Sequence, residues 1–127
     1  MKKLLLVTLL ALGAITYPPV QAKICKFCRS DDFNQLIKDN AHVVVDFYSP
    51  SCPPCMRLKP VFEELGTEMN TVLFITVNVQ DFSSLASRFG ISSIPHLKVF
   101  KDGKEIDYST GYKSKTSLRT WVNSVLS

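Results

Sequence analysis

A strongly strand-forming run ends directly before two closely spaced cysteines in the middle of this chain. Residues 43–48 read Val-Val-Val-Asp-Phe-Tyr, a β-branched and aromatic sequence that favours a strand. Its nearly continuous apolar character indicates burial on both faces, as in the middle of a largely parallel sheet. Residues 52–55 read Cys-Pro-Pro-Cys, and the pattern from Cys52 to about Glu68 predicts a helix. We therefore expect an α/β domain with the cysteine pair between a buried strand and a helix.

The spacing of apolar residues predicts the other elements of this domain. In chain order they are a short strand at 24–27, a helix after Ser30 carrying Phe33, Leu36 and Ile37, a strand at 72–79, a helix at 83–89 ending at Gly90, strands at 97–100 and 105–109, and a C-terminal helix capped by Ser114. The Asp102-Gly103 pair favours a tight hairpin between the last two strands. The order βαβαβαββα predicts a three-layer domain, with a central mixed sheet flanked by helices.

The central helix is expected to place four of its apolar side chains in the core. These are Met56, Val61, Phe62 and Leu65. Pro60 lies inside the same helix and is expected to bend it, because proline removes one hydrogen bond of the helical ladder.

The first 22 residues have the order of a secretory signal peptide. A basic head at residues 1–3 precedes an apolar run from Leu4 to Ile15, and a segment with small residues ends at Ala22. The apolar run is shorter than the roughly 20 residues that a membrane-spanning helix needs. Cleavage after Ala22 would leave residues 23–127 as one domain in the periplasm. A leader retained as a membrane anchor is the alternative.

The charge of the chain argues against a nucleic-acid partner. The formal net charge is +4 at pH 7, and two of the lysines lie in the predicted leader. No basic cluster of the kind that binds nucleic acid remains in the rest of the chain. Export would expose the four cysteines to oxidants and to disulfide exchange, so redox chemistry is the context in which they are interpreted.

The positions of Cys52 and Cys55 suit thiol–disulfide exchange. At a helix N-terminus, unpaired N–H groups and the positive end of the helix dipole favour a thiolate over a thiol. A disulfide can close across the first helical turn, with Cys52 exposed at the helix tip and Cys55 turned inward. Cys52 could then attack a substrate disulfide, and Cys55 could resolve the mixed disulfide. Half of a zinc site and a static structural disulfide are the alternatives.

In order and approximate spacing, several motifs together resemble the thioredoxin family. They are Asp46-Phe47-Tyr48, Cys-Pro-Pro-Cys at 52–55, Ser93-Ile94-Pro95 and Gly111, and the match extends over about residues 24–126. The resemblance implies that Cys52 is the nucleophile and Cys55 the resolving thiol. It also implies a cis peptide at Ile94–Pro95 beside the disulfide, and a buried carboxylate, that of Asp46, behind it.

Four positions depart from the usual thioredoxin pattern. Tyr48 and Ser51 stand where the family usually has tryptophans, and Ser93 replaces a common glycine. Thr76 stands where thioredoxins typically carry a lysine near the buried aspartate. The exchange chemistry does not depend on these residues, whereas the partner-binding surface and the proton transfer do.

The surroundings of Asp46 and Pro95 suggest roles for both residues. Apolar neighbours predict a poorly solvated Asp46 carboxylate with a raised pKa, which could take the proton from Cys55 as that thiol attacks. An exposed carboxylate at the sheet edge is the alternative. A cis proline leaves its neighbours' backbone groups free for strand-like pairing, so the Ile94 backbone is the candidate contact for a substrate peptide. Pro95 could also be only a loop breaker.

Pro53 and Pro54 favour a reductase. Neither residue has an N–H to donate to the Cys52 sulfur, and no basic residue lies inside the motif. Less thiolate stabilisation favours the disulfide form and makes the couple a better reductant. In an oxidising compartment such a protein needs a membrane electron donor. His96 could oppose this by stabilising the thiolate, or it could face the other side of its strand.

Cys25 and Cys28 form a second Cys-x-x-Cys motif, whose role the sequence leaves open. On a continuous strand their Cα atoms would lie roughly 10 Å apart, and a disulfide requires less than about 7 Å. A resolving thiol, a metal site with a histidine, and buried small hydrophobes are all compatible with the pattern.

The whole sequence predicts a monomeric protein-disulfide oxidoreductase without cofactor or metal. Its expected substrates are proteins with disulfides or thiols. A copper or zinc carrier and a redox-inert binding module with the same fold are the competing functions.

Overall fold

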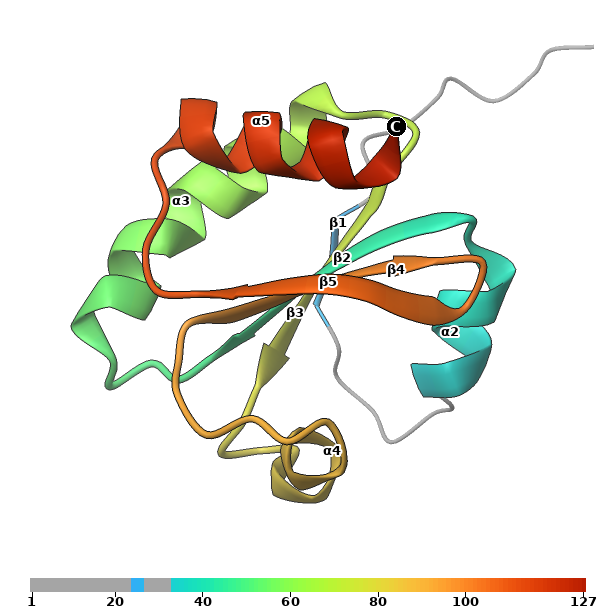
Figure 1. Cartoon of the computed structure of the whole chain (residues 1–127). Coiled ribbons are helices and arrows are strands. Elements are labelled where there is room, and N and C mark those ends of the chain that lie inside the picture. Colours follow the sequence, from blue (N-terminus) through green and yellow to red (C-terminus); the bar gives the residue numbers. More distant parts are fainter. Residues whose placement is uncertain (1–23, 27–32) are drawn as a thin grey trace, which may run out of the picture.

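The computed structural model describes residues 24–26 and 33–127. The predicted leader at 1–22, Cys28 and the predicted helix cap Ser30 lie outside the described residues. The elements are β1 (Ile24–Lys26), α2 (Phe33–Asp39), β2 (His42–Tyr48), α3 (Pro53–Glu68), β3 (Leu73–Asn78), α4 (Ser83–Arg88), β4 (His96–Lys101), β5 (Lys104–Thr110) and α5 (Lys115–Leu126). The predicted order of strands and helices is confirmed (Figure 1).

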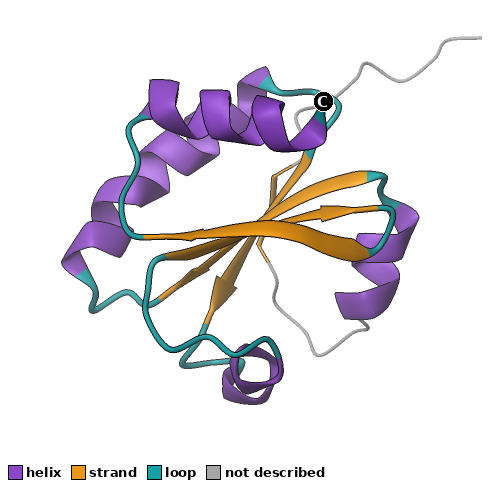
Figure 2. Cartoon of the chain, viewed as in Figure 1, coloured by secondary structure: helices purple, strands orange, loops and turns teal. Residues whose placement is uncertain are grey.

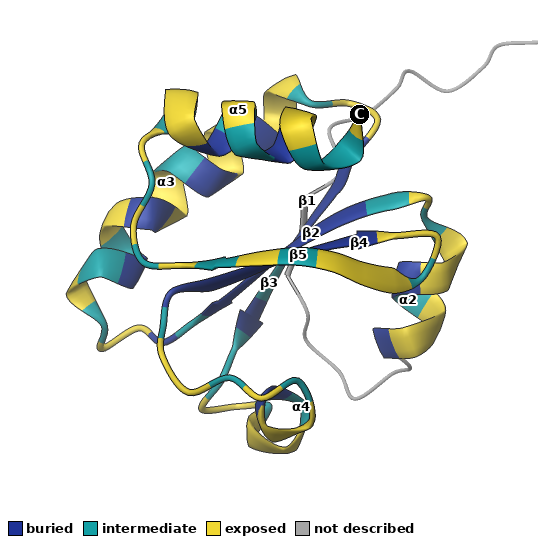
Figure 3. Ribbon diagram, viewed as in Figure 1, coloured by how far each residue is buried: buried dark blue, intermediate teal, exposed yellow. Residues whose placement is uncertain are grey.

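The sheet is mixed and has β2 at its centre. Its five strands lie in the order β1-β3-β2-β4-β5. β1 and β2 both pair with β3 in parallel, whereas β4 pairs with β2 and β5 in antiparallel fashion. The five inner residues of β2 are all buried, as the apolar run predicted (Figure 3). The cysteine pair therefore follows the carboxyl end of a strand that lies in the middle of the sheet.

Helices cover both faces of the sheet and form a separate core on each (Figure 2). α3 and α5 lie on one face, and the buried core there is Val44, Leu58, Phe62, Leu65, Val72, Phe74, Leu97, Val99, Leu118 and Val122. α2 and α4 lie on the other face, and the buried core there is Phe33, Ile37, Val43, Val45, Phe47, Leu73, Ile75, Val77 and Phe100. The side of the sheet on which a residue lies therefore decides whether it can approach the cysteine helix.

One prediction for α3 was wrong. Met56 is half-buried, while Leu58 is fully buried beside Phe62 and Leu65. The buried line along this helix begins at Cys55 and continues at steps of three and four residues, which is the spacing of one helix face. Met56 comes one residue after Cys55, so its side chain lies to the side of this buried face.

The hairpin between β4 and β5 has the predicted turn. Asp102 and Gly103 both have positive φ, at 52° and 82°. Two central residues with positive φ form the turn that matches the twist of a two-residue hairpin, and glycine and aspartate tolerate it best. A Cβ at Gly103 would also lie only 3.1 Å from Cγ of Lys38.

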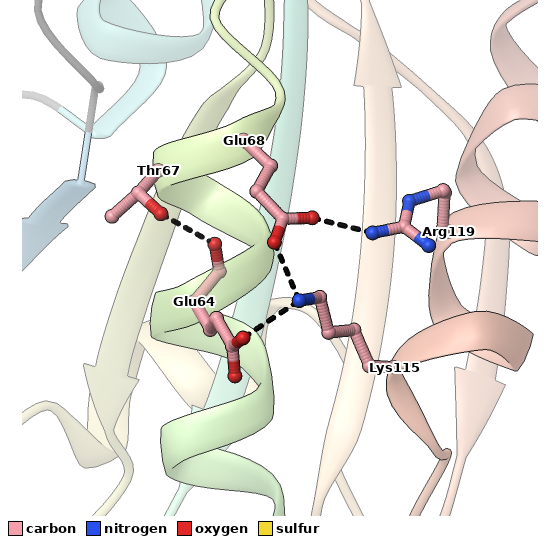
Figure 4. Close-up of polar contacts among 5 residues, drawn as sticks. All are labelled: Glu64, Thr67, Glu68, Lys115 and Arg119. Carbon is pink, nitrogen blue, oxygen red and sulfur yellow. Dashed lines mark hydrogen bonds and ion pairs between the residues drawn. The ribbon is translucent and has the colours of Figure 1, made fainter.

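Side-chain ion pairs join α5 to α3 (Figure 4). Lys115 Nζ lies 2.7 Å from Glu64 Oε1 and also pairs with Glu68, which in turn accepts from Arg119. Hydrogen bonds from Lys115, the larger cause, and from Arg119 lower the pKa of Glu68. Solvent and salt screen such exposed pairs, so they contribute little to the free energy of unfolding. None of the helices described here is long and apolar enough to cross a membrane.

Candidate active site

Cys52 and Cys55 form a disulfide at the start of α3. Cys52 is the N-cap of this helix, Pro53 and Pro54 follow, and the Cα atoms of the cysteines are 5.2 Å apart. Cys55 is completely buried, whereas Cys52 is partly exposed. The Cys55 backbone N–H donates to Cys52 Sγ over 3.3 Å. Only the sulfur of Cys52 can therefore meet a large substrate first.

Hydroxyl groups hold the loop that precedes Cys52. Ser49 is 3 % exposed, and its Oγ lies 2.9 Å from Ser51 Oγ. Gln80, from the loop after β3, donates through Nε2 to Ser51 Oγ over 3.3 Å. The Cys52 N–H donates to the Ser49 carbonyl over 3.2 Å. The roles of Ser49 and Gln80 were not predicted, although a serine directly after a buried strand was an available signal for the first.

The loop before β4 lies against the disulfide. The Ile94–Pro95 peptide bond is cis, and the Ile94 carbonyl oxygen is 3.8 Å from Cys52 Sγ. The Gly111 N–H donates to the Pro95 carbonyl over 2.9 Å and joins this loop to the end of β5. The backbone of Ile94 thus borders Cys52 Sγ, while its contact with a substrate peptide stays a prediction.

Asp46 is a buried carboxylate on the α3 side of the sheet. It pairs in register with Leu97 of β4 and is 2 % exposed. Its Oδ1 has no hydrogen-bond partner among the described residues. Burial raises the pKa of Asp46 from 3.8 to about 7, because the ionised form is poorly solvated. The alternative of an exposed carboxylate is excluded, while its part in proton transfer stays a prediction.

His96 faces the side of the sheet away from α3. It pairs in register with Phe47, whose side chain belongs to the core beneath α2 and α4. The His96 ring stacks on Tyr108, with centroids 5.5 Å apart and planes at 15°. Burial, followed by the charge of Lys98, lowers the pKa of His96. Of the two orientations considered, the structure has the one that leaves the Cys52 thiolate without an imidazolium beside it.

Over residues 24–26 and 33–127, no group of three His, Cys, Asp or Glu side chains could hold a metal ion. Cys25 lies on β1, opposite Ile75 of β3, and Cys28 lies outside the described residues. The chemistry visible in this structure is therefore that of the Cys52–Cys55 pair.

Comparison with known proteins agrees with this geometry. The family model for thioredoxin matches residues 24–124. The chain belongs to the thioredoxin family. It is 42 % identical to a thioredoxin of Chlamydia caviae over 98 residues, which are 77 % of this chain and 95 % of that protein. It is 40 % identical to a thioredoxin of Bacillus subtilis over 82 residues, which are 64 % and 79 % of the two chains.

Solved thioredoxin structures show the same fold. A mutant thioredoxin from Halobacterium salinarum has a TM-score of 0.76 and 26 % identity, covering 88 % of this chain and 96 % of its own. Oxidised thioredoxin from Plasmodium falciparum has a TM-score of 0.73 and 28 % identity, covering 83 % and 100 %. Family membership and the Cys52–Cys55 pair together make this thioredoxin-family protein a thiol–disulfide oxidoreductase that acts on protein disulfides.

Proposed function

We propose that this protein is an exported reductase of protein disulfides in the bacterial envelope, working as a monomer and kept reduced by a membrane electron donor. The order of basic, apolar and small residues in positions 1–22 supports export. Exchange chemistry follows from the family, whereas the direction of electron flow is argued from the surroundings of Cys52.

The sparse stabilisation of the Cys52 sulfur carries the argument for a reductase. Its backbone donor is the Cys55 N–H, because Pro53 and Pro54 have none to give. The Ile94 carbonyl oxygen, 3.8 Å away, presents negative rather than positive partial charge. His96 faces the opposite side of the sheet. A thiolate with little stabilisation makes the dithiol easier to oxidise, so the protein gives electrons to its substrates.

The reaction transfers two electrons from the protein to the substrate. The Cys52 thiolate attacks one sulfur of a substrate disulfide, forms a mixed disulfide and releases the first substrate thiolate. Asp46, ionised at that stage, takes the proton from the Cys55 thiol. The Cys55 thiolate then attacks Cys52 Sγ, which releases the second substrate thiolate and closes the protein disulfide.

The redox state of the protein in cells tests location and direction together. Trypsin cuts after Lys38 and Arg57, so one peptide contains Cys52 and Cys55 and no other cysteine. After rapid alkylation of cell fractions, we expect the protein in the envelope fraction, beginning at Lys23, with this peptide mostly in the dithiol form. In the Cys52→Ser variant, Cys55 has lost its disulfide partner, so the variant shows how completely this peptide is alkylated when it carries a free thiol. A mature protein found mostly as the disulfide would contradict the reductase, and a full-length cytoplasmic chain would contradict export.

A further inference from the structure

The end of β5 brings a large aromatic side chain to the edge of the active site. The Gly111 N–H donates to the Pro95 carbonyl over 2.9 Å. The preceding residue, Ile94, has its carbonyl oxygen 3.8 Å from Cys52 Sγ. Tyr112 directly follows Gly111 and is 46 % exposed. The start of α3, the loop before β4 and the end of β5 therefore meet at one end of the sheet, beside the disulfide (Figure 1).

Arg57 approaches the same tyrosine from α3. Its guanidinium carbon lies 5.9 Å from the centroid of the Tyr112 ring. Arg57 follows Cys52 by five residues, which is about 7.5 Å along a helix axis. An extended peptide covers a similar distance in about two or three residues. A substrate side chain within about four residues of the attacked cysteine can therefore reach the guanidinium.

The charges of the segments around these contacts are all positive. Residues 49–59, 90–95 and 110–114 contain no Asp or Glu, and their charged side chains are those of Arg57, Lys59 and Lys113. In the described part of the chain, none of these three cations has an ion-pair partner. A guanidinium held against a ring face keeps N–H groups available for a carboxylate.

Two carboxylates limit the extent of this positive surface. Asp107 accepts from Trp121 Nε1 over 3.1 Å, and Lys113 Nζ lies 5.5 Å from the centroid of the same ring. The charge of Lys113 is therefore partly offset. Asp81 belongs to the loop after β3, and β3 lies on the other side of β2 from β4 and β5. The positive charge is thus centred on Arg57 and lies on one side of the disulfide.

We propose that Arg57 and Tyr112 form a subsite for an acidic side chain of the substrate, within about four residues of the cysteine that Cys52 attacks. The inference rests on the proposed function, because the ligand is part of a protein substrate. Tyr112 positions the guanidinium, which donates hydrogen bonds to the substrate carboxylate. A substrate lysine at the same position meets a like charge and is disfavoured. Proteins with Glu or Asp close to a disulfide are therefore the preferred substrates.

Symmetric peptide disulfides test the subsite. Otherwise neutral peptides carry Glu, Gln or Lys in turn at each of the four positions on either side of the cysteine. The second-order rate of reduction by the pre-reduced protein is divided by the rate with dithiothreitol, which corrects for the reactivity of each disulfide. At low ionic strength we expect Glu to react about 2- to 5-fold faster than Gln, and Lys more slowly than Gln, on one side of the cysteine. The preference should disappear in about 1 M salt, where the screening length is about 3 Å.

Two charge reversals separate the subsite from the net charge of the protein. Arg57→Glu should reverse the preference, so that the Lys peptide reacts faster than the Glu peptide. Lys104→Glu changes the net charge equally, but Lys104 is exposed at the start of β5, at the other end of the sheet from Cys52. This control should keep the wild-type preference. Each variant is compared across peptides, so a change in the reactivity of its Cys52 thiolate cancels.

Equal corrected rates for Glu and Gln at all positions in the wild type would overturn the subsite, and so would the same change of preference in both charge-reversal variants. Tyr112→Leu removes the ring but leaves Arg57, and it should lower the ratio of the Glu rate to the Gln rate. An unchanged ratio would exclude Tyr112 from the subsite. The wild-type comparison stands even if a variant does not fold.

The reverse reaction separates the subsite from the proposed reductase. The oxidised protein is mixed with the same peptides as thiols, so that two peptide thiols are oxidised to one disulfide while the Cys52–Cys55 disulfide is reduced. If Glu is preferred in this direction while the reduced protein fails to reduce any peptide disulfide, the reductase is wrong and the subsite stands. If peptides are reduced without a preference for Glu, the subsite alone is wrong. If the protein reacts in neither direction, both proposals fail.

Discussion

Replacing Asp46 by asparagine is expected to stabilise the oxidised protein, and the gain should grow by roughly 4 kcal/mol between pH 4 and pH 8. The carboxyl group is 2 % exposed, and burial raises its pKa to about 7. In the unfolded chain the same group ionises near the ordinary aspartate pKa of 3.8. Below that value both states hold the proton, and the two proteins should differ little.

The sign of the effect follows from proton binding. Between the two pKa values the folded protein retains a proton that the unfolded chain has lost, so stability falls as the pH rises. Above pH 7 both states are ionised, and the full penalty of burying the charge is present. Asparagine does not ionise and escapes this penalty.

Urea denaturation of the oxidised proteins, followed by circular dichroism from pH 4 to pH 8, measures the difference. Asp102→Asn is the matched control, since Asp102 is exposed in the hairpin turn at a positive φ that asparagine also tolerates. The control should follow the wild type throughout. If the curves of wild type and Asp46→Asn run parallel across this range, the buried-carboxylate account is wrong.

Cys52→Ser is expected to abolish disulfide reduction, and Cys55→Ser is expected to stop the reaction at the mixed disulfide. Cys52 is partly exposed at the helix tip, whereas Cys55 is completely buried, so only the first can attack a protein substrate. Without Cys55 the mixed disulfide has no internal thiol to resolve it. The pre-reduced variants are incubated with insulin, quenched with acid and separated on non-reducing gels.

The trapping experiment has an internal control for the other cysteines. A double Cys52→Ser, Cys55→Ser variant shows any background from Cys25 and Cys28. We expect adducts with Cys55→Ser alone. Equal trapping by the two single variants would contradict the order of attack.

The central strand and the hairpin could be predicted because their signals are local. The Val-Val-Val run of β2 has a strong strand preference, and the Asp102-Gly103 pair suits a turn with two positive φ angles. The cysteine pair was found in the same way, from a motif next to a buried strand. The resemblance to thioredoxins then set the order of these parts along the chain.

The orientation of His96 could not be predicted, because β4 is buried on both faces. Leu97 and Val99 lie toward α3, while His96 and Lys98 lie on the other side, and five of the six residues of the strand are buried. The alternation of His96, Leu97, Lys98 and Val99 separates the two faces of the strand, but it does not show which face meets which helix. The register with Phe47 decides the matter, and register is a property of the folded sheet.

The contacts between residues far apart in the sequence could not be predicted either. Lys98 reaches Glu105 across a hairpin with an irregularity at Val99/Phe100, which shifts the pairing. Ser51 meets Gln80 through two loops that follow neighbouring strands. In α3, the burial of Leu58 in place of the predicted Met56 depends on the exact rotation of the helix against the sheet.

The reduction potential of the Cys52–Cys55 couple tests the account most directly. Equilibration with glutathione buffers, read from the tryptic peptide that contains only these cysteines, should give a value near that of reducing thioredoxins, about −270 mV. Pro54→His adds the missing basic group and should raise the potential, while Pro54→Ala restores only an N–H and should raise it less. A wild-type potential approaching about −120 mV would contradict the account and make the protein a disulfide donor.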